Sequence, residues 1–109
     1  MHFRKLVVYQ TAIQILPLTV RLDLPTGYGE IRDQLRRASL SIGLNIAESS
    51  GKTTPAEQRR FFAIARGSAV ECAALVDACR ALGIGQEGVL EGIDLRLLEV
   101  VRMLSKLAR

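Results

Sequence analysis

The side chains best suited to chemistry are scarce in this sequence of 109 residues. His2 is the single histidine, and the two cysteines, Cys72 and Cys79, are seven positions apart in a stretch with helical periodicity. That spacing puts their Cα atoms about 10 Å apart along a helix, which is beyond the reach of a disulfide. Neither thiol has a second ligand at metal-site spacing or a base placed beside it by the sequence. We predict two buried free thiols, no metal, no cofactor, no catalytic residue and no enzymatic activity.

A segment from Ile31 to Glu48 carries two apolar faces at helical spacing. One face consists of Ile31, Leu35, Ala38, Ile42 and Ile46. The other face consists of Leu40, Leu44 and Ala47. A surface helix of a small monomer needs only one apolar face. We therefore predict that the second face is covered by other helices or by other subunits, and we assign it to an oligomer interface.

Polar residues run between these two faces and continue into the next predicted helix. They are Arg37, Ser41, Asn45 and Glu48, followed by Arg60, Arg66 and Glu71. Two interpretations remain open. In the first, Arg37 or Arg66 pairs with Glu48 or Glu71 in an internal network. Because buried ion pairs add little net stability, the role of such a network would be to fix the register of the helices. In the second, the polar residues line a binding groove or a channel through an oligomer.

The chain is mildly basic, with a net charge of +4 and a pI near 9.6. Such a balance permits binding to nucleic acid without requiring it. The basic residues gather near the predicted connection between the second and third helices, and repetition by every subunit of a ring would turn them into a basic rim or channel. The candidate nucleic-acid-binding residues are Arg36, Arg37, Lys52, Arg59, Arg60 and Arg66.

The elements that must position these residues are helices. Hydrophobic residues make up 49% of the chain, and periodicity predicts helices at about residues 3–22, 28–50, 55–82 and 86–108, within one domain of residues 1–109. Thr54, Pro55 and Glu57 form a helix start signal with a capping box, and Gly83 supplies a stop. Short links and no strand pattern predict an all-α, antiparallel up-down four-helix bundle. No segment is suited to span a membrane, and we expect a cytoplasmic protein.

Three motifs make the sequence similar to a known family. They are Phe3 to Gln10 (FRKLVVYQ), Gln34 to Glu48 (QLRRASLSIGLNIAE) and Arg60 to Glu71 (RFFAIARGSAVE). Together they resemble the bacterial four-helix-bundle proteins encoded in intervening sequences of 23S ribosomal RNA genes. The chain departs from the family pattern at Gly43, where proline is common, and at Ser49, where glycine is common.

The resemblance implies a four-helix bundle that assembles into a cyclic homo-oligomer of five subunits. It also implies a relationship to the accessory variability determinant proteins of diversity-generating retroelements, which bind a reverse transcriptase and nucleic acid. Our leading hypothesis is a non-enzymatic, oligomeric accessory protein that binds RNA or DNA and partners a reverse transcriptase. The alternative is an oligomeric protein-interaction scaffold with no nucleic-acid role.

Overall fold

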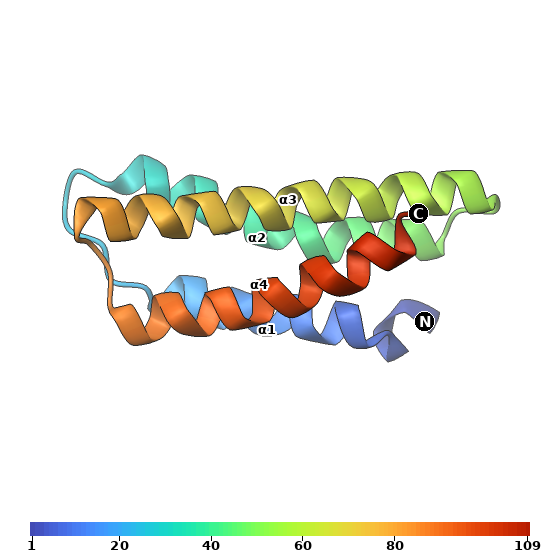
Figure 1. Cartoon of the computed structure of the whole chain (residues 1–109), viewed down its shortest axis with the longest axis horizontal. Helices are drawn as coiled ribbons and strands as arrows, with labels where there is room; N and C mark the ends of the chain where they lie inside the picture. Colours follow the sequence, from blue (N-terminus) through green and yellow to red (C-terminus); the bar gives the residue numbers. More distant parts are fainter.

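A computed structural model describes all 109 residues and contains helices but no strands. A short 3-10 helix, η1, precedes four α-helices, which form a rod of 45 × 20 × 20 Å (Figure 1). The elements are η1 (His2–Lys5), α1 (Val7–Arg21), α2 (Gly29–Ser50), α3 (Pro55–Leu82) and α4 (Glu87–Leu107). The prediction of an all-α fold with four helices is confirmed.

The ends of α3 follow from the local signals in the sequence. The Thr54 hydroxyl accepts a hydrogen bond from the Glu57 N–H at 3.2 Å, and Pro55 occupies the first turn, where its missing N–H costs nothing. At the other end Gly83 takes the left-handed conformation with φ of 69°, and the Ile84 N–H bonds back to the Cys79 carbonyl at 2.9 Å. These caps explain why α3 stops cleanly before the short link to α4.

The first predicted helix, about residues 3–22, is divided in the structure. Leu6 has extended backbone angles, φ of −71° and ψ of 126°, and separates η1 from α1. The break is held by a hydrogen bond from Gln10 Nε2 to the Arg4 carbonyl at 3.0 Å. The rings of Phe3 and Tyr9 also meet edge to face, with centroids 4.9 Å apart. The N-terminal residues therefore fold back on α1 rather than extending it.

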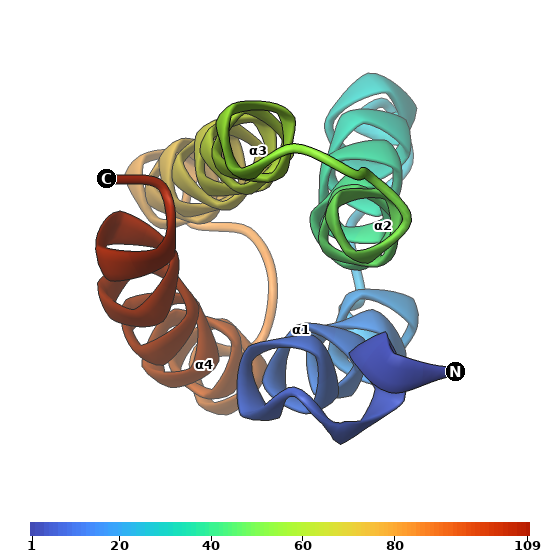
Figure 2. The same cartoon turned by 90° about the vertical axis from the view of Figure 1, so that its right-hand side faces the viewer.

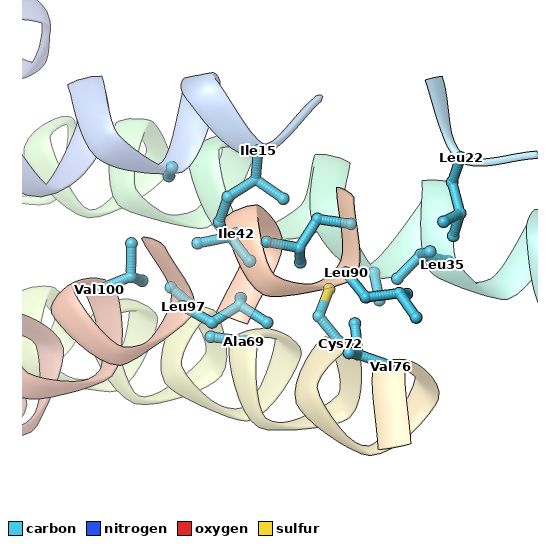
Figure 3. Close-up of a cluster of buried hydrophobic side chains, with 14 of the residues drawn as sticks. Ile15, Leu22, Leu35, Ile42, Ala69, Cys72, Val76, Leu90, Leu97 and Val100 are labelled. Carbon is cyan, nitrogen blue, oxygen red and sulfur yellow. The ribbon is translucent and has the colours of Figure 1, made fainter. Parts of the chain in front are cut away.

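The four helices surround a single core when the rod is viewed along its axis (Figure 2). Each helix packs closely against two neighbours, whereas the backbones of the diagonal pairs α1–α3 and α2–α4 do not approach each other closely. Ile15, Ile42, Cys72 and Leu97 bring one side chain from each helix into the same core (Figure 3). Cys72 and Cys79 are fully buried and free, as the sequence predicted.

Helices α1 and α2 come close together at Gly43. A Cβ atom at this position would lie 3.3 Å from Ile13 Cδ1 and 3.7 Å from Tyr9 Cε1. Glycine inside a helix costs about 1 kcal/mol relative to alanine. The tight approach of α1 explains why a residue without a side chain occupies this turn.

Candidate nucleic-acid interface

The polar residues between α2 and α3 form a small neutral network. The hydroxyls of Ser41 and Ser68 are 2.8 Å apart, which links the two helices directly. Asn45 Nδ2 donates to the Ser41 carbonyl at 2.8 Å and to the Ser41 hydroxyl at 3.0 Å. Two residues before Gly51, the Ser49 hydroxyl donates to the Gln58 carbonyl at 2.9 Å. These bonds fix the register of α3 along α2 without any charged group.

The internal Arg–Glu network considered for this seam is not formed. Arg37 and Glu71 are exposed and make no ion pair. Glu48 instead pairs with Lys52 at 3.2 Å, one turn along the chain. Arg66 Nε donates to the Ser105 hydroxyl on α4 at 2.8 Å. Small neutral side chains bring α2 and α3 together here, so the arginines remain at the surface.

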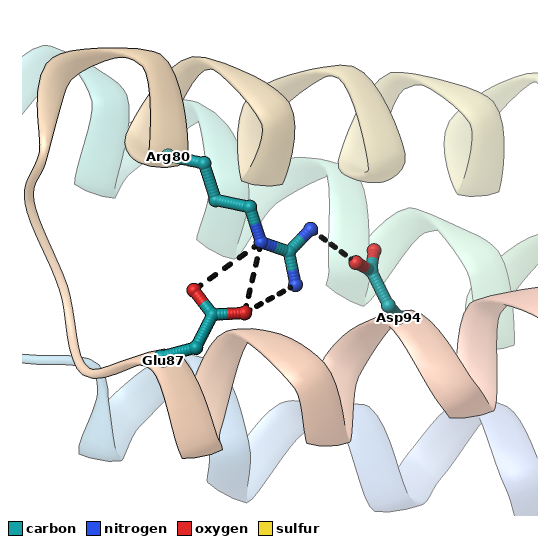
Figure 4. A network of polar contacts seen from close by, with 3 residues as sticks. All are labelled: Arg80, Glu87 and Asp94. Atoms are coloured by element: carbon teal, nitrogen blue, oxygen red, sulfur yellow. Dashed lines mark hydrogen bonds and ion pairs between the residues drawn. The ribbon is translucent and has the colours of Figure 1, made fainter.

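The strongest ionic cluster lies elsewhere, between the end of α3 and the beginning of α4 (Figure 4). Arg80 pairs with Glu87, with Nη2 and Oε1 3.0 Å apart, and also with the Asp94 carboxylate. Hydrogen bonds to Glu87 and then to Asp94 raise the pKa of the Arg80 guanidinium above its ordinary value. This cluster was not predicted from the sequence, because the partners lie 7 and 14 positions from Arg80, across a turn.

Four of the six candidate basic residues lie near the α2–α3 connection. Lys52 Nζ is 4.8 Å and Arg60 Cζ is 5.6 Å from the centroid of the Phe61 ring, so both cations lie over this ring. Arg59 and Arg66 are exposed on α3. These residues place positive charge on the end of the rod that the connection caps.

Arg36 and Arg37 lie farther from the connection than the other four candidates do. Both are exposed on α2. They precede Lys52 by 16 and 15 positions, which is roughly 23 Å along a helix at 1.5 Å per residue. Proximity in sequence therefore overstated how closely they approach the connection.

The structure adds basic residues that the sequence analysis did not select. Both chain ends lie at the end of the rod that carries the α2–α3 connection (Figures 1 and 2). We call this end the basic half and define it by dividing each helix at its midpoint, which assigns it residues 1–14, 40–68 and 97–109. It holds nine of the 15 Lys and Arg residues. They are Arg4, Lys5, Lys52, Arg59, Arg60, Arg66, Arg102, Lys106 and Arg109.

Acidic residues show the opposite distribution. The basic half contains three of the 11 Asp and Glu residues, namely Glu48, Glu57 and Glu99. The other half, which we call the acidic half, holds the remaining eight acidic residues against six basic ones. A modest net charge thus becomes a strong separation of charge along the rod. In an up-down four-helix bundle, the connection between the second and third helices lies at the same end as both chain termini. The predicted helices therefore already indicated that the basic residues near the termini and near this connection lie in the same half.

The second apolar face of α2 is not covered within the chain. Leu40 is 48% exposed, Leu44 is 60% exposed and Ala47 is half-buried. Ile13 of α1, which lies beside Gly43 of α2, is also exposed. The two leucines therefore present apolar area that the other helices of the same chain leave in solvent.

A second apolar surface lies between α3 and α4 and was not predicted. It is a shallow groove with a volume of ≈ 410 Å³. The lining residues are Val70, Ala73, Asp94, Leu97, Leu98 and Val101. Leu98 is 50% exposed, and α4 lies diagonally across the bundle from α2 (Figure 2). The exposed leucines of α2 and this groove therefore lie on opposite sides of the molecule.

The buried thiols are poorly suited to nucleophilic chemistry. Burial, and secondarily the Glu71 carboxylate, raises the pKa of Cys72 to about 12. Burial also raises the pKa of Cys79. Since the thiolate is the reactive form, both groups are held in their unreactive state.

Nowhere do three His, Cys, Asp or Glu side chains gather in a way that would hold a metal ion. None of the helices has the length and apolar character needed to cross a membrane.

Comparison with known proteins gives one family match. The model of the family described as 23S rRNA-intervening sequence protein matches residues 4–106, which is nearly the whole chain. No curated protein matches the chain.

Proposed function

Because the chain belongs to the 23S rRNA-intervening sequence protein family, we propose that it is a non-enzymatic, homo-oligomeric accessory protein that binds nucleic acid. The observation that carries this proposal is the charge separation along the rod. Nine Lys and Arg residues gather at the end where both termini and the α2–α3 connection meet. Clustered positive charge attracts phosphate and raises its local concentration, whatever the sequence of the nucleic acid.

Most of these cations are free to bind an external anion. The only ion pair in the basic half joins Lys52 to Glu48, and both side chains are partly exposed. Arg59, Arg102 and Lys106 are exposed and make no ion pair. Each phosphate that such a group neutralises releases condensed counterions, which favours binding at low salt.

The two apolar surfaces support assembly with other copies of the chain. We propose that Leu40 and Leu44 of one subunit dock into the groove of the next subunit, where Leu98 is exposed. Contact between two different surfaces is head-to-tail, and it generates a ring when the rotation closes. An antiparallel up-down bundle in a ring of five, as the family resemblance implies, would repeat the basic half five times around one axis.

Charge complementarity also favours this docking. Arg37 is exposed one turn before Leu40 and Ser41 on α2. Asp77 and Glu91 are exposed one turn beyond Ala73 and Asp94, at the acidic end of the groove. In the docked arrangement Arg37 would gain a carboxylate partner in the neighbouring subunit, and its structural role would be between subunits rather than within one.

Fluorescence anisotropy with a labelled 20-nucleotide probe tests nucleic-acid binding. Affinity should fall steeply with salt, because each neutralised phosphate contributes about −0.7 to −0.9 to the slope of log affinity against log salt. Arg59→Ala should weaken binding and flatten this slope. Arg21→Ala is the matched control, because it removes the same charge from an exposed position in the acidic half. Equal effects of the two variants would contradict a binding surface at the basic end.

The alternative function is an oligomeric protein-interaction scaffold with no role in nucleic-acid binding. The exposed leucines and the groove favour it as much as they favour the first proposal, since both need self-assembly. An intact oligomer that binds no probe at low salt would favour the scaffold. If the protein serves a retroelement, a reverse transcriptase is the expected partner, and co-purification of the two tagged proteins with and without nuclease would test that partnership.

A further inference from the structure

The aromatic side chains of this protein are all partly buried. The chain has five of them, and none is exposed. They are Phe3, Tyr9, Tyr28, Phe61 and Phe62. Tyr28, the aromatic residue nearest a loop, lies at the beginning of α2, in the acidic half and away from the clustered cations. No ring of the basic half is presented freely to solvent as a platform on which a base could stack.

Each ring of the basic half already has partners within the chain. The Phe61 ring lies beneath the cationic groups of Lys52 and Arg60. Phe3 packs edge to face against Tyr9, and Arg4 Cζ lies 5.6 Å from the Phe3 centroid. Phe62 packs against the buried core. A base could reach Phe61 or Phe3 only after a cation had moved away.

The groups that remain for a ligand are almost purely electrostatic. Proteins that hold single strands combine a basic groove with aromatic platforms, and stacking contributes about 1–3 kcal/mol per base. Without platforms, affinity depends on phosphate contacts, and it rises with the charge density of the ligand. A duplex carries one negative charge per ≈ 1.7 Å of its axis, with every phosphate on the outside.

We infer that the basic half binds double-helical nucleic acid through its phosphates, and does not bind single strands through stacked bases. This inference rests on the proposed nucleic-acid binding and names the form of the ligand. The 20 Å width of the rod is similar to that of a duplex, so several of its basic side chains can reach phosphates at once. The same chemistry carries little sequence information, because phosphate contacts position a protein but do not read bases.

The test compares a labelled 20-base-pair duplex with one of its own strands, using the full chain in its native oligomeric state. At low salt we expect the duplex to bind about tenfold more tightly and to show the steeper salt slope, near −0.9 per contact against −0.7 for the single strand. A 2-aminopurine base placed in the single strand should keep its fluorescence when protein is added. Phe61→Leu, with folding checked by circular dichroism, should change the affinity for either probe less than twofold.

The opposite results separate this inference from the proposed function. A single strand that binds as tightly as the duplex, or 2-aminopurine quenching that Phe61→Leu removes, would overturn the inference and leave nucleic-acid binding intact. An intact oligomer that binds neither probe at low salt would overturn the proposed function and the inference together. A preference for the duplex that is reduced by Arg59→Ala, but not by Arg21→Ala, would support both the inference and the proposed function.

Discussion

The two halves of the bundle differ in the balance of their charges, with nine basic against three acidic residues in the basic half and six against eight in the acidic half. In the acidic half Arg80 is surrounded by Glu87 and Asp94, and the three side chains join the end of α3 to the beginning of α4 (Figure 4). In the basic half Arg59 has no carboxylate partner, and Arg66 reaches only the Ser105 hydroxyl. Each half contains one ion-paired cation, Lys52 or Arg80, so the halves differ in the excess of positive charge rather than in the pairing of their cations. If the proposed function is right, this excess of positive charge attracts an external anion.

Disrupting assembly should have the largest effect, because it decides whether the basic half acts alone or as part of a ring. Leu44→Glu and Leu98→Glu place a charge on each of the two exposed apolar surfaces. Either change alone should reduce the mass measured by light scattering to that of the 12.0 kDa chain. The helical circular dichroism signal should persist, because neither leucine is buried within the subunit. Val20→Glu, at an exposed position on α1, is the control and should leave the mass unchanged.

Reversing charge in the basic half should abolish binding without affecting the fold. Lys106→Glu combined with Arg109→Glu should reduce duplex affinity on the order of 100-fold at low salt, since two attractive contacts become repulsive. The denaturation midpoint should stay close to that of the parent protein, because both side chains are exposed. An unchanged affinity, measured by anisotropy, would show that the C-terminal end takes no part in the site.

High pH should destabilise the acidic half through Cys72. Its raised pKa means that the native state holds the thiol proton more tightly than the unfolded chain, whose thiol titrates near the ordinary value of 9.0. The resulting stability is complete below about pH 9 and is lost as the pH rises toward about 12. Between pH 8 and pH 10.5 the parent protein should lose about 1–2 kcal/mol more stability in urea than Cys72→Ala does. Parallel losses in the two proteins would contradict a buried, protonated thiol.

The smallest effect should come from the ionic cluster itself. Arg80→Ala should lower the denaturation midpoint slightly, because exposed ion pairs contribute little. The difference between variant and parent should shrink in high salt, which screens exposed charges. Arg59→Ala, which removes an unpaired cation from the basic half, should leave the midpoint unchanged or raise it. A larger loss from Arg59→Ala than from Arg80→Ala would reverse the comparison between the halves.

Local signals in the sequence account for most of the fold. The capping box at Thr54, the left-handed Gly83 and the apolar repeat through Cys72 and Cys79 predicted α3 and its buried thiols. Such features depend on residues within a few positions of one another, so they can be recognised without tertiary structure. The break at Leu6 was missed because it depends on a fold-back, in which Phe3 meets Tyr9 and Gln10 bonds to Arg4.

The site was predicted less completely. Lys52, Arg59, Arg60 and Arg66 were selected because they are close in sequence, and they do lie at or near the α2–α3 connection. Arg36 and Arg37 were selected on the same ground, but they lie roughly 20 Å before the end of α2. The α4 contributors, Arg102, Lys106 and Arg109, were not selected, because nothing near them in the sequence marks a site.

Periodicity and caps by themselves determined the helices, the buried thiols and the unusual second face of α2, because each is a property of one helix. The predicted order of helices indicated that both chain ends share one end of the rod, but the tertiary structure alone decided how the charges are placed around it (Figure 2). It also formed the groove between α3 and α4 and paired Arg80 with Asp94, because both features need two helices at a fixed distance. Charge and apolar area act through space, and only the folded chain sets those distances.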